Sequence, residues 1–139
     1  IAAREGLRET NAETQLIGVT QLTSTDEAML RDLKIEGAMP AVVREYAQLA
    51  EAAGLDGIVC SALDLPELVS ACRTDFRFVT PGIRPTNSQA DDQKRVATVL
   101  DARQNGATDL VIGRPITRAE HPEQVYQMLL EQWKGQFSW

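Results

Sequence analysis

Two arginines follow short apolar runs, in positions where they could bind an anion. Arg114 comes directly after Gly113, and Arg84 comes shortly after Pro81 and Gly82. Arginine can donate two parallel hydrogen bonds to a phosphate, and a glycine lets the phosphate approach the backbone N–H groups that begin a following helix. Gly113 and Arg114 therefore predict a phosphate site, with a turn glycine beside a surface arginine as the alternative. The Pro81-Gly82 pair predicts a tight turn that directs Arg84 across neighbouring strand ends, and a solvated loop is the alternative.

Hydroxyl groups follow the first apolar run of the chain. Thr23 and Ser24 come a few residues after the run at 16–20, so either could hydrogen-bond a ligand. The stretch Ser24–Glu27 also matches the S-x-x-E pattern, in which a serine caps a helix. Ser24 is therefore either a cap or a ligand-binding residue.

The remaining candidates for chemistry favour ordinary roles. Gln93 lies in the long polar loop after the third apolar run, where it is by itself a surface amide. Asp91 and Asp92 could form an acid–base pair, although a solvated loop or a helix start suits them better. His121, the single histidine, precedes a proline at a helix start, which indicates a capping or surface role. The positions of the serine, histidine and aspartate residues do not support a Ser-His-Asp triad, and no spacing of possible metal ligands fits a metal site.

Four short apolar runs must supply the strands that position these residues. They are continuously apolar, which is typical of strands in a parallel sheet covered by helices. A helical pattern follows each run, and Asp64–Glu67 resembles the capping box of one such helix. The predicted strands lie at 16–20, 57–60, 76–79 and 109–112, and the predicted helices at 26–33, 39–53, 64–72, 98–105 and from 122 onward.

The order of these elements predicts an α/β fold with a parallel sheet. No glycine-rich dinucleotide fingerprint follows any run, which weakens a Rossmann interpretation. A (β/α)8 barrel needs roughly 250 residues and eight strand–helix units, so residues 1–139 make about half of one barrel domain. Residues 1–9 have the pattern of a helix without an N-cap signal, and we therefore expect the chain to begin inside something larger.

Composition narrows the class of protein. The 139 residues are 43% hydrophobic and 24% charged, as in a globular chain of one domain. The net charge of −6 argues against nucleic acid as a partner, because nucleic-acid binding needs clustered Lys and Arg. No apolar run approaches the roughly 18 residues of a membrane span. Cys60 and Cys72 form no Cys-x-x-Cys pair, so two buried structural thiols and a reduced cytosolic context are expected.

Five sequence pieces, taken together, resemble the bacterial orotidine 5′-phosphate decarboxylases along the whole chain. Each piece alone is weakly specific, whereas their order and spacing form a specific combination. They are similar to the C-terminal half of that family, and residues 3–7 (AREGL) resemble the helix after its fourth strand. The pieces are 18–25 (GVTQLTST), 54–61 (GLDGIVCS), 79–84 (VTPGIR), 92–96 (DQKRV) and 111–117 (VIGRPIT).

The resemblance implies a (β/α)8 barrel, of which this chain supplies the C-terminal half. It also implies a lyase of de novo pyrimidine biosynthesis that converts orotidine 5′-monophosphate to UMP and CO2 without a cofactor or metal. By the same resemblance, Thr23 lies in the substrate pocket, Ser24 hydrogen-bonds the pyrimidine and Pro81 lines the base pocket.

The phosphate end of the substrate is likewise assigned by resemblance. Arg84 is expected to contact the nucleotide near its phosphate, and Gln93 to reach the phosphate from a loop that folds over it. Gly113 and Arg114 are expected to hold the phosphate itself. Closure of that loop would use phosphate binding energy to organise a site remote from the phosphate.

One motif of the family is not in this chain. Its catalytic lysine and aspartates belong to an Asp-x-Lys-x-x-x-Asp pattern, and none of the lysines here, Lys34, Lys94 and Lys134, stands in such a pattern. No catalytic residue is therefore predicted in this chain, and we expect it to be inactive alone. The resemblance implies two partners, the missing N-terminal half of the barrel and a second subunit of a cytoplasmic homodimer.

Two alternatives stay open. A sister barrel acting on a sugar phosphate, such as a hexulose-phosphate synthase or a pentose-phosphate epimerase, would share a Gly-Arg phosphate site, although the pieces LTS and TPGIR argue against it. The non-enzymatic alternative is an autonomous half-barrel that binds phosphate without chemistry. The helical start of the chain argues against that alternative.

Overall fold

Four parallel strands form one sheet in chain order, as the sequence predicts. The computed structural model describes residues 1–10, 12–85 and 95–135. The strands are β1 (Ile17–Val19), β2 (Gly57–Val59), β3 (Arg77–Thr80) and β4 (Asp109–Leu110). Each strand is parallel to the next, and the sheet order is β1-β2-β3-β4. This sequential parallel order confirms the predicted α/β class and the four strand–helix units of about half a (β/α)8 barrel.

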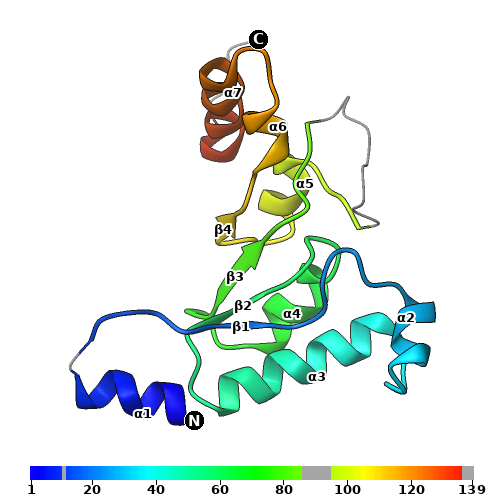
Figure 1. Cartoon of the computed structure of the whole chain (residues 1–139), viewed down its shortest axis with the longest axis vertical. Coiled ribbons are helices and arrows are strands. Elements are labelled where there is room, and N and C mark those ends of the chain that lie inside the picture. The colour runs from blue at the N-terminus through cyan, green and yellow to red at the C-terminus, as the bar shows by residue number, and fades with distance from the viewer. Residues whose placement is uncertain (11, 86–94, 136–139) are drawn as a thin grey trace.

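Helices follow every strand. The helices are α1 (Ala2–Glu9), α2 (Glu27–Asp32), α3 (Met39–Ala52), α4 (Leu65–Ala71), α5 (Val99–Gln104), α6 (Arg114–Thr117) and α7 (Pro122–Lys134). Figure 1 shows α3 lying alongside β1 and β2, and α7 next to α6 near the other end of the molecule. Prolines stand in the first turns of α3, α4, α6 and α7, where a missing backbone N–H costs no hydrogen bond.

The apolar core lies between the sheet and the helices that cover one of its faces. Ile58 and Phe78 occupy paired positions of β2 and β3 and are 0% and 4% exposed. They belong to one buried cluster with Val43 of α3 and Leu68 of α4. Phe76 packs edge to face against Phe78, with ring centroids 5.8 Å apart. This core fixes the sheet relative to α3 and α4.

The opposite face of the sheet is open and carries a row of three valines beside the ion pair of Arg77 and Asp109. Val19 pairs with Val59, which pairs with Val79, so these three side chains share that face. Val19 is 62% exposed, and Val111, just beyond β4, is 51% exposed. In the described residues no helix covers this face. Val19 is thus exposed on the face that a complete (β/α)8 barrel would enclose.

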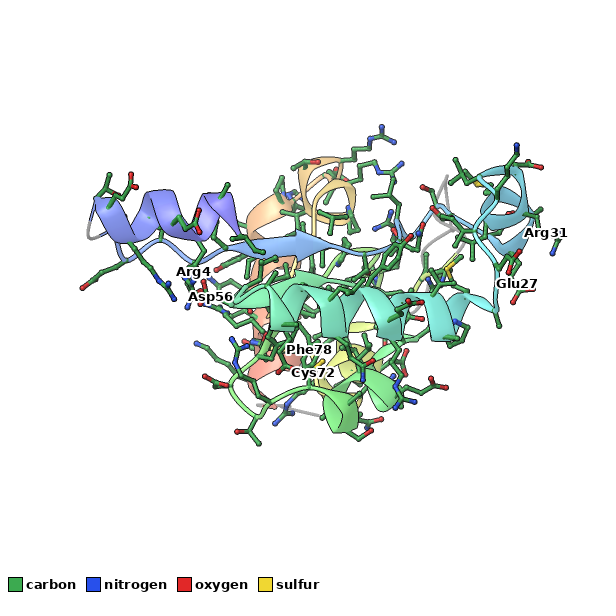
Figure 2. All side chains as sticks on the ribbon, turned by 90° about the horizontal axis from the view of Figure 1, so that it is seen from below. Arg4, Glu27, Arg31, Asp56, Cys72 and Phe78 are labelled. Carbon is green, nitrogen blue, oxygen red and sulfur yellow. The ribbon has the colours of Figure 1, made fainter. Side chains whose placement is uncertain are left out.

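Ion pairs join the elements at the edge of the sheet where the strands begin. Arg4 of α1 donates to both carboxylate oxygens of Asp56 at 2.6 and 3.0 Å, and the Leu16 backbone N–H donates to the same carboxylate at 2.8 Å. Figure 2 shows Arg4 and Asp56 side by side. Arg77 of β3 pairs in the same region with Asp109 of β4. These contacts connect α1 and the starts of all four strands.

Two of the predicted helix caps are wrong. Ser24 does not cap α2; the N-cap is Asp26, whose carboxylate accepts the Met29 backbone N–H at 2.9 Å. Asp64 occupies the N-cap position of α4, but its side chain makes no capping hydrogen bond, because the carboxylate pairs with Arg95 instead. Thr98 and Asp101 form a reciprocal capping box at α5, in the manner expected for that motif.

The two cysteines are free thiols in different surroundings. Cys60 is buried, as expected, whereas Cys72 is only half-buried. Burial raises the pKa of the Cys60 thiol to about 12. A thiol with so high a pKa holds almost no thiolate at neutral pH, so Cys60 is a structural residue.

Candidate functional site

The loops that follow the four strands begin side by side at one edge of the sheet, here called the carboxyl edge (residues 20–26, 60–64, 81–85, 95–98 and 111–114). Backbone hydrogen bonds between neighbouring strands continue past the strand ends. The Thr20 N–H donates to the Val59 carbonyl at 3.3 Å, and the Cys60 N–H donates to the Val79 carbonyl at 3.1 Å. The Val111 N–H donates to the Thr80 carbonyl at 3.0 Å. Parallel strands place functional loops at this edge of a barrel. This edge therefore carries the predicted residues of the β1, β3 and β4 loops.

Thr23 and Ser24 lie in a tight turn after β1. The turn is closed by a hydrogen bond of 2.9 Å from the Thr25 N–H to the Leu22 carbonyl. Thr23 is 5% exposed, and its carbonyl accepts the Arg95 N–H at 3.2 Å. Ser24 is half-buried, and its hydroxyl makes no hydrogen bond within the described ranges. The hydroxyl of Ser24 is thus not committed to a helix cap.

Pro81 and Arg84 lie after β3, where the chain is held by a second short parallel pairing. Gly82 has a φ of +76°, which glycine adopts without strain. The Arg84 N–H donates to the Ala97 carbonyl at 2.9 Å, and the Ala97 N–H donates to the Gly82 carbonyl at 3.3 Å. Arg84 is 8% exposed, and its Nη1 donates to the Ile83 carbonyl at 2.9 Å. The alternative of a solvated surface arginine is therefore wrong for Arg84.

Gly113 is the N-cap residue of α6, the short helix after the last strand, and Arg114 is its first residue. The Gly113 carbonyl accepts the N–H groups of Ile116 and Thr117 at 2.9 and 3.1 Å. Gly113 is exposed, and a Cβ added to it would have no neighbouring heavy atom within 4 Å. Arg114 is half-buried. The backbone at Gly113 is therefore open to an approaching ligand.

The remaining residues singled out by sequence lie outside the described residues or at the surface. Gln93, Asp91 and Asp92 lie outside the described residues. His121 is exposed at the N-cap position of α7, and its side chain makes no capping hydrogen bond, which leaves the surface role. No cluster of three or more His, Cys, Asp or Glu that could hold a metal ion occurs within residues 1–10, 12–85 and 95–135.

Sequence reasoning missed an ion pair at the carboxyl edge. The Arg95 guanidinium pairs with the Asp64 carboxylate, and their side chains are 14% and 4% exposed. Burial raises the pKa of the Asp64 carboxyl above its usual range, and the positive charge of Arg95 opposes that rise. Arg95 belongs to the DQKRV piece, but no local pattern predicts a partner 31 residues away.

Two hollows along α7 lie away from the predicted residues. One, of about 740 Å³, runs along α6 and α7 and is lined by Ile116, Pro122 and Tyr126 among others. A smaller one, of about 210 Å³, lies between α7 and β4 beside Leu110 and Trp133. The predicted site residues line neither. The described part of the chain thus presents its candidate site as an open loop edge.

Comparison with known proteins gives one family. The model of the orotidine 5′-phosphate decarboxylase / HUMPS family matches residues 1–129. The orotidine 5′-phosphate decarboxylase of Staphylococcus haemolyticus is 47% identical over 135 residues, which are 96% of this chain and 59% of that protein. The chain thus spans less than two thirds of the length of the curated relatives it matches.

Solved structures agree with the sequence comparison. An orotidine 5′-phosphate decarboxylase from Lactobacillus acidophilus matches with a TM-score of 0.71 and 33% identity, over 86% of this chain and 49% of that one. An uncharacterized conserved protein from Geobacillus kaustophilus matches with a TM-score of 0.75 and 37% identity, over 95% and 56% of the two chains. No helix among the described residues is long and apolar enough to cross a membrane.

Proposed function

Because the chain belongs to the orotidine 5′-phosphate decarboxylase / HUMPS family, we propose that it is the nucleotide-binding part of an orotidine 5′-phosphate decarboxylase. The complete enzyme would remove CO2 from orotidine 5′-monophosphate to give UMP. The observation that carries this proposal is the 47% identity to a relative of that name over nearly the whole chain. The carboxyl edge supports it, because residues suited to a base and to a phosphate stand there together.

The base end of the nucleotide is assigned to the loops after β1 and β3. Ser24 donates or accepts a hydrogen bond at the pyrimidine, for which its uncommitted hydroxyl is suited. Thr23 forms the pocket wall beside it, and Pro81 contributes an apolar surface against the ring. Thr23 is buried and held by the Arg95 N–H at 3.2 Å, so this wall has a fixed position.

The phosphate end is assigned to the loops after β3 and β4. Gly113 lets the phosphate approach the backbone closely, and Arg114 provides the cationic fork that suits a phosphate. Arg84 contacts the nucleotide near the phosphate, and Gln93 closes over it. Since β3 and β4 are neighbours in the sheet, the loops that carry Arg84 and Gly113 begin next to each other.

The reaction itself needs groups that this chain does not carry. The lysine and aspartates of the Asp-x-Lys-x-x-x-Asp pattern would destabilise the substrate carboxylate and protonate the carbanion that remains. We therefore propose that residues 1–139 are one part of a single barrel domain, completed by a segment that carries this pattern. The open face at Val19, which is 62% exposed, is suited to such a partner. A homodimer in the cytoplasm, without cofactor or metal, completes the proposal.

The family description also covers HUMPS proteins, so a sugar phosphate is the second candidate substrate class. The completed barrel should be compared in a thermal-shift assay with UMP and with ribulose 5-phosphate. The decarboxylase proposal predicts that UMP raises the unfolding temperature at concentrations where ribulose 5-phosphate has no effect. Stabilisation by the sugar phosphate alone would overturn it in favour of the sister enzymes.

A further inference from the structure

Arg95 connects the loops of three neighbouring strands at the carboxyl edge. Its backbone N–H donates to Thr23 in the loop after β1 at 3.2 Å, and its guanidinium pairs with Asp64 in the loop after β2. Two residues further on, Ala97 is paired with the Gly82–Arg84 segment after β3, through bonds of 2.9 and 3.3 Å. Residues 95–97 therefore contact all three loops, two of them through Arg95 itself.

The Arg95–Asp64 pair is buried, although its geometry is not the most stabilising one. Oδ2 of Asp64 and Nη1 of Arg95 are buried without a hydrogen-bond partner in the described part of the chain. The pair therefore lacks the two-pronged contact of the strongest arginine–carboxylate pairs. A buried ion pair often gives no more stability than apolar side chains of similar size. Its clear effect here is geometric, because it fixes the loop after β2 to the segment that begins at Arg95.

The Asp64 side chain contacts Arg95 instead of capping its own helix, α4. Asp64 occupies the N-cap position of α4, where a carboxylate usually accepts a backbone N–H of the first turn. Here the side chain makes no such bond and points its carboxylate to Arg95. The longer-range contact across the edge has replaced the local one.

We propose that Asp64 and Arg95 are positioning residues that hold Thr23 and Ser24 at a fixed separation from Arg84. They touch no substrate and act through the loops they join. The inference rests on the proposed function, in which the first loop receives the base and the second approaches the phosphate. A fixed separation lets base and phosphate be bound at the same time, so that one nucleotide binds far better than its two halves separately.

This advantage of linkage can be measured as a ratio of dissociation constants. The ratio is the product of the Kd values of uridine and of inorganic phosphate, divided by the Kd of UMP. All three Kd values are determined on the completed barrel by NMR titration. The test variant is the double substitution D64N/R95M, which removes both charges and leaves neither buried alone. The matched control is R4M/D56N, which breaks the ion pair at the opposite edge of the sheet.

The expected result is a ratio about tenfold lower in D64N/R95M, since a misplacement of about 1 Å can cost as much as a hundredfold in an oriented site. The control should keep the wild-type ratio even where its unfolding temperature falls. The single variant R95K keeps a charge opposite Asp64 and should show a smaller decrease, and it serves as the test variant if the double variant does not fold.

Two outcomes would overturn the positioning role. An unchanged ratio in D64N/R95M, or in R95K where the double variant does not fold, would make the pair a purely structural contact. An equal loss of the ratio in R4M/D56N would show that any destabilisation has the same effect. Failure of the proposed function is a separate result, in which the unsubstituted completed barrel does not bind UMP at all.

Discussion

Single residues at the carboxyl edge differ in how firmly the protein itself holds them. Arg84 is 8% exposed and donates to a neighbouring carbonyl, whereas Gly113 is open to solvent with room above its backbone. Ser24 keeps a hydroxyl that caps no helix. The edge thus combines a buried arginine (Arg84), a glycine with an accessible backbone (Gly113) and a hydroxyl that caps no helix (Ser24). This combination is suited to a ligand with one anionic end and one polar ring.

Gln93 offers a test of the phosphate assignment at the residue scale. In the completed enzyme, Gln93→Ala should raise KM for orotidine 5′-monophosphate, because the amide that we propose to contact the phosphate is lost. Loss of one hydrogen bond to a charged group, worth about 1.5–3 kcal/mol, corresponds to roughly tenfold or more in kcat/KM. Steady-state kinetics on the nucleotide and on the phosphate-free nucleoside check this. Equal losses for both substrates would contradict a contact to the phosphate.

The strands and helices were largely predictable, and the reasons for the exceptions are physical. Continuous apolar runs predicted all four strands, of which β2 and β3 carry buried side chains while β1 and β4 are only partly buried. The observed strands are shorter by one or two residues at most of their ends. The cap at Ser24 failed because the turn at Leu22–Thr25 delays the helix until Asp26. The cap at Asp64 failed because Arg95, distant in sequence, takes its carboxylate.

The candidate site was predictable only in part. Spacing after apolar runs placed Thr23, Arg84 and Gly113 at one edge, because parallel strands all end there. It gave no sign that Arg84 is buried or that Arg95 joins the loops. Both facts depend on contacts between segments whose proximity exists only in the folded sheet.

The stability of β2 should be sensitive to substitution of Gly57, because its backbone lies close to Arg77. A Cβ at this position would lie 2.6 Å from the Arg77 Cβ and 2.9 Å from the Arg77 carbonyl carbon. Gly57→Ala should therefore lower the free energy of unfolding by about 1–3 kcal/mol, the usual cost of overpacking, as measured by urea denaturation. Gly6→Ala in α1 is the matched control, since its added Cβ meets no heavy atom within 4 Å and alanine favours a helix. Comparable destabilisation by both substitutions would contradict the close approach at Gly57.

The contact between α1 and β2 should be visible in the pH dependence of stability. The hydrogen bond from Arg4 is the main cause that lowers the pKa of Asp56, followed by that from the Leu16 N–H. A carboxyl whose folded pKa is depressed stabilises the fold above its ordinary pKa of about 4, and this contribution disappears as the pH falls through the folded value. Asp56→Asn should therefore lower the unfolding temperature at pH 7, with a difference from wild type that shrinks below about pH 4.

The exposed Glu13→Gln variant controls for the removal of one negative charge. Its difference from wild type should stay small across the same pH range. A difference for Asp56→Asn that is constant from pH 7 to pH 3 would show that the ion pair does not cause the effect.

At the scale of the whole molecule, helices cover only one face of the sheet. The helices α3 and α4 pack against that face, whereas the other face exposes Val19. The edge strands of the sheet are β1 and β4. Open edges and apolar faces favour association. The chain spans 59% of the Staphylococcus haemolyticus relative, and the proposed complement supplies the lysine-containing pattern.

The most direct measurement is the rate of orotidine 5′-monophosphate decarboxylation, followed by the loss of substrate absorbance. It should be made on the purified chain alone and on the chain co-expressed with the portion of the Staphylococcus haemolyticus enzyme that it does not match. We expect no turnover above the uncatalysed rate for the chain alone, and decarboxylation when the complementary portion supplies the lysine and aspartates. Turnover by the chain alone, or a well-folded complex that neither binds UMP nor decarboxylates the substrate, would contradict this expectation.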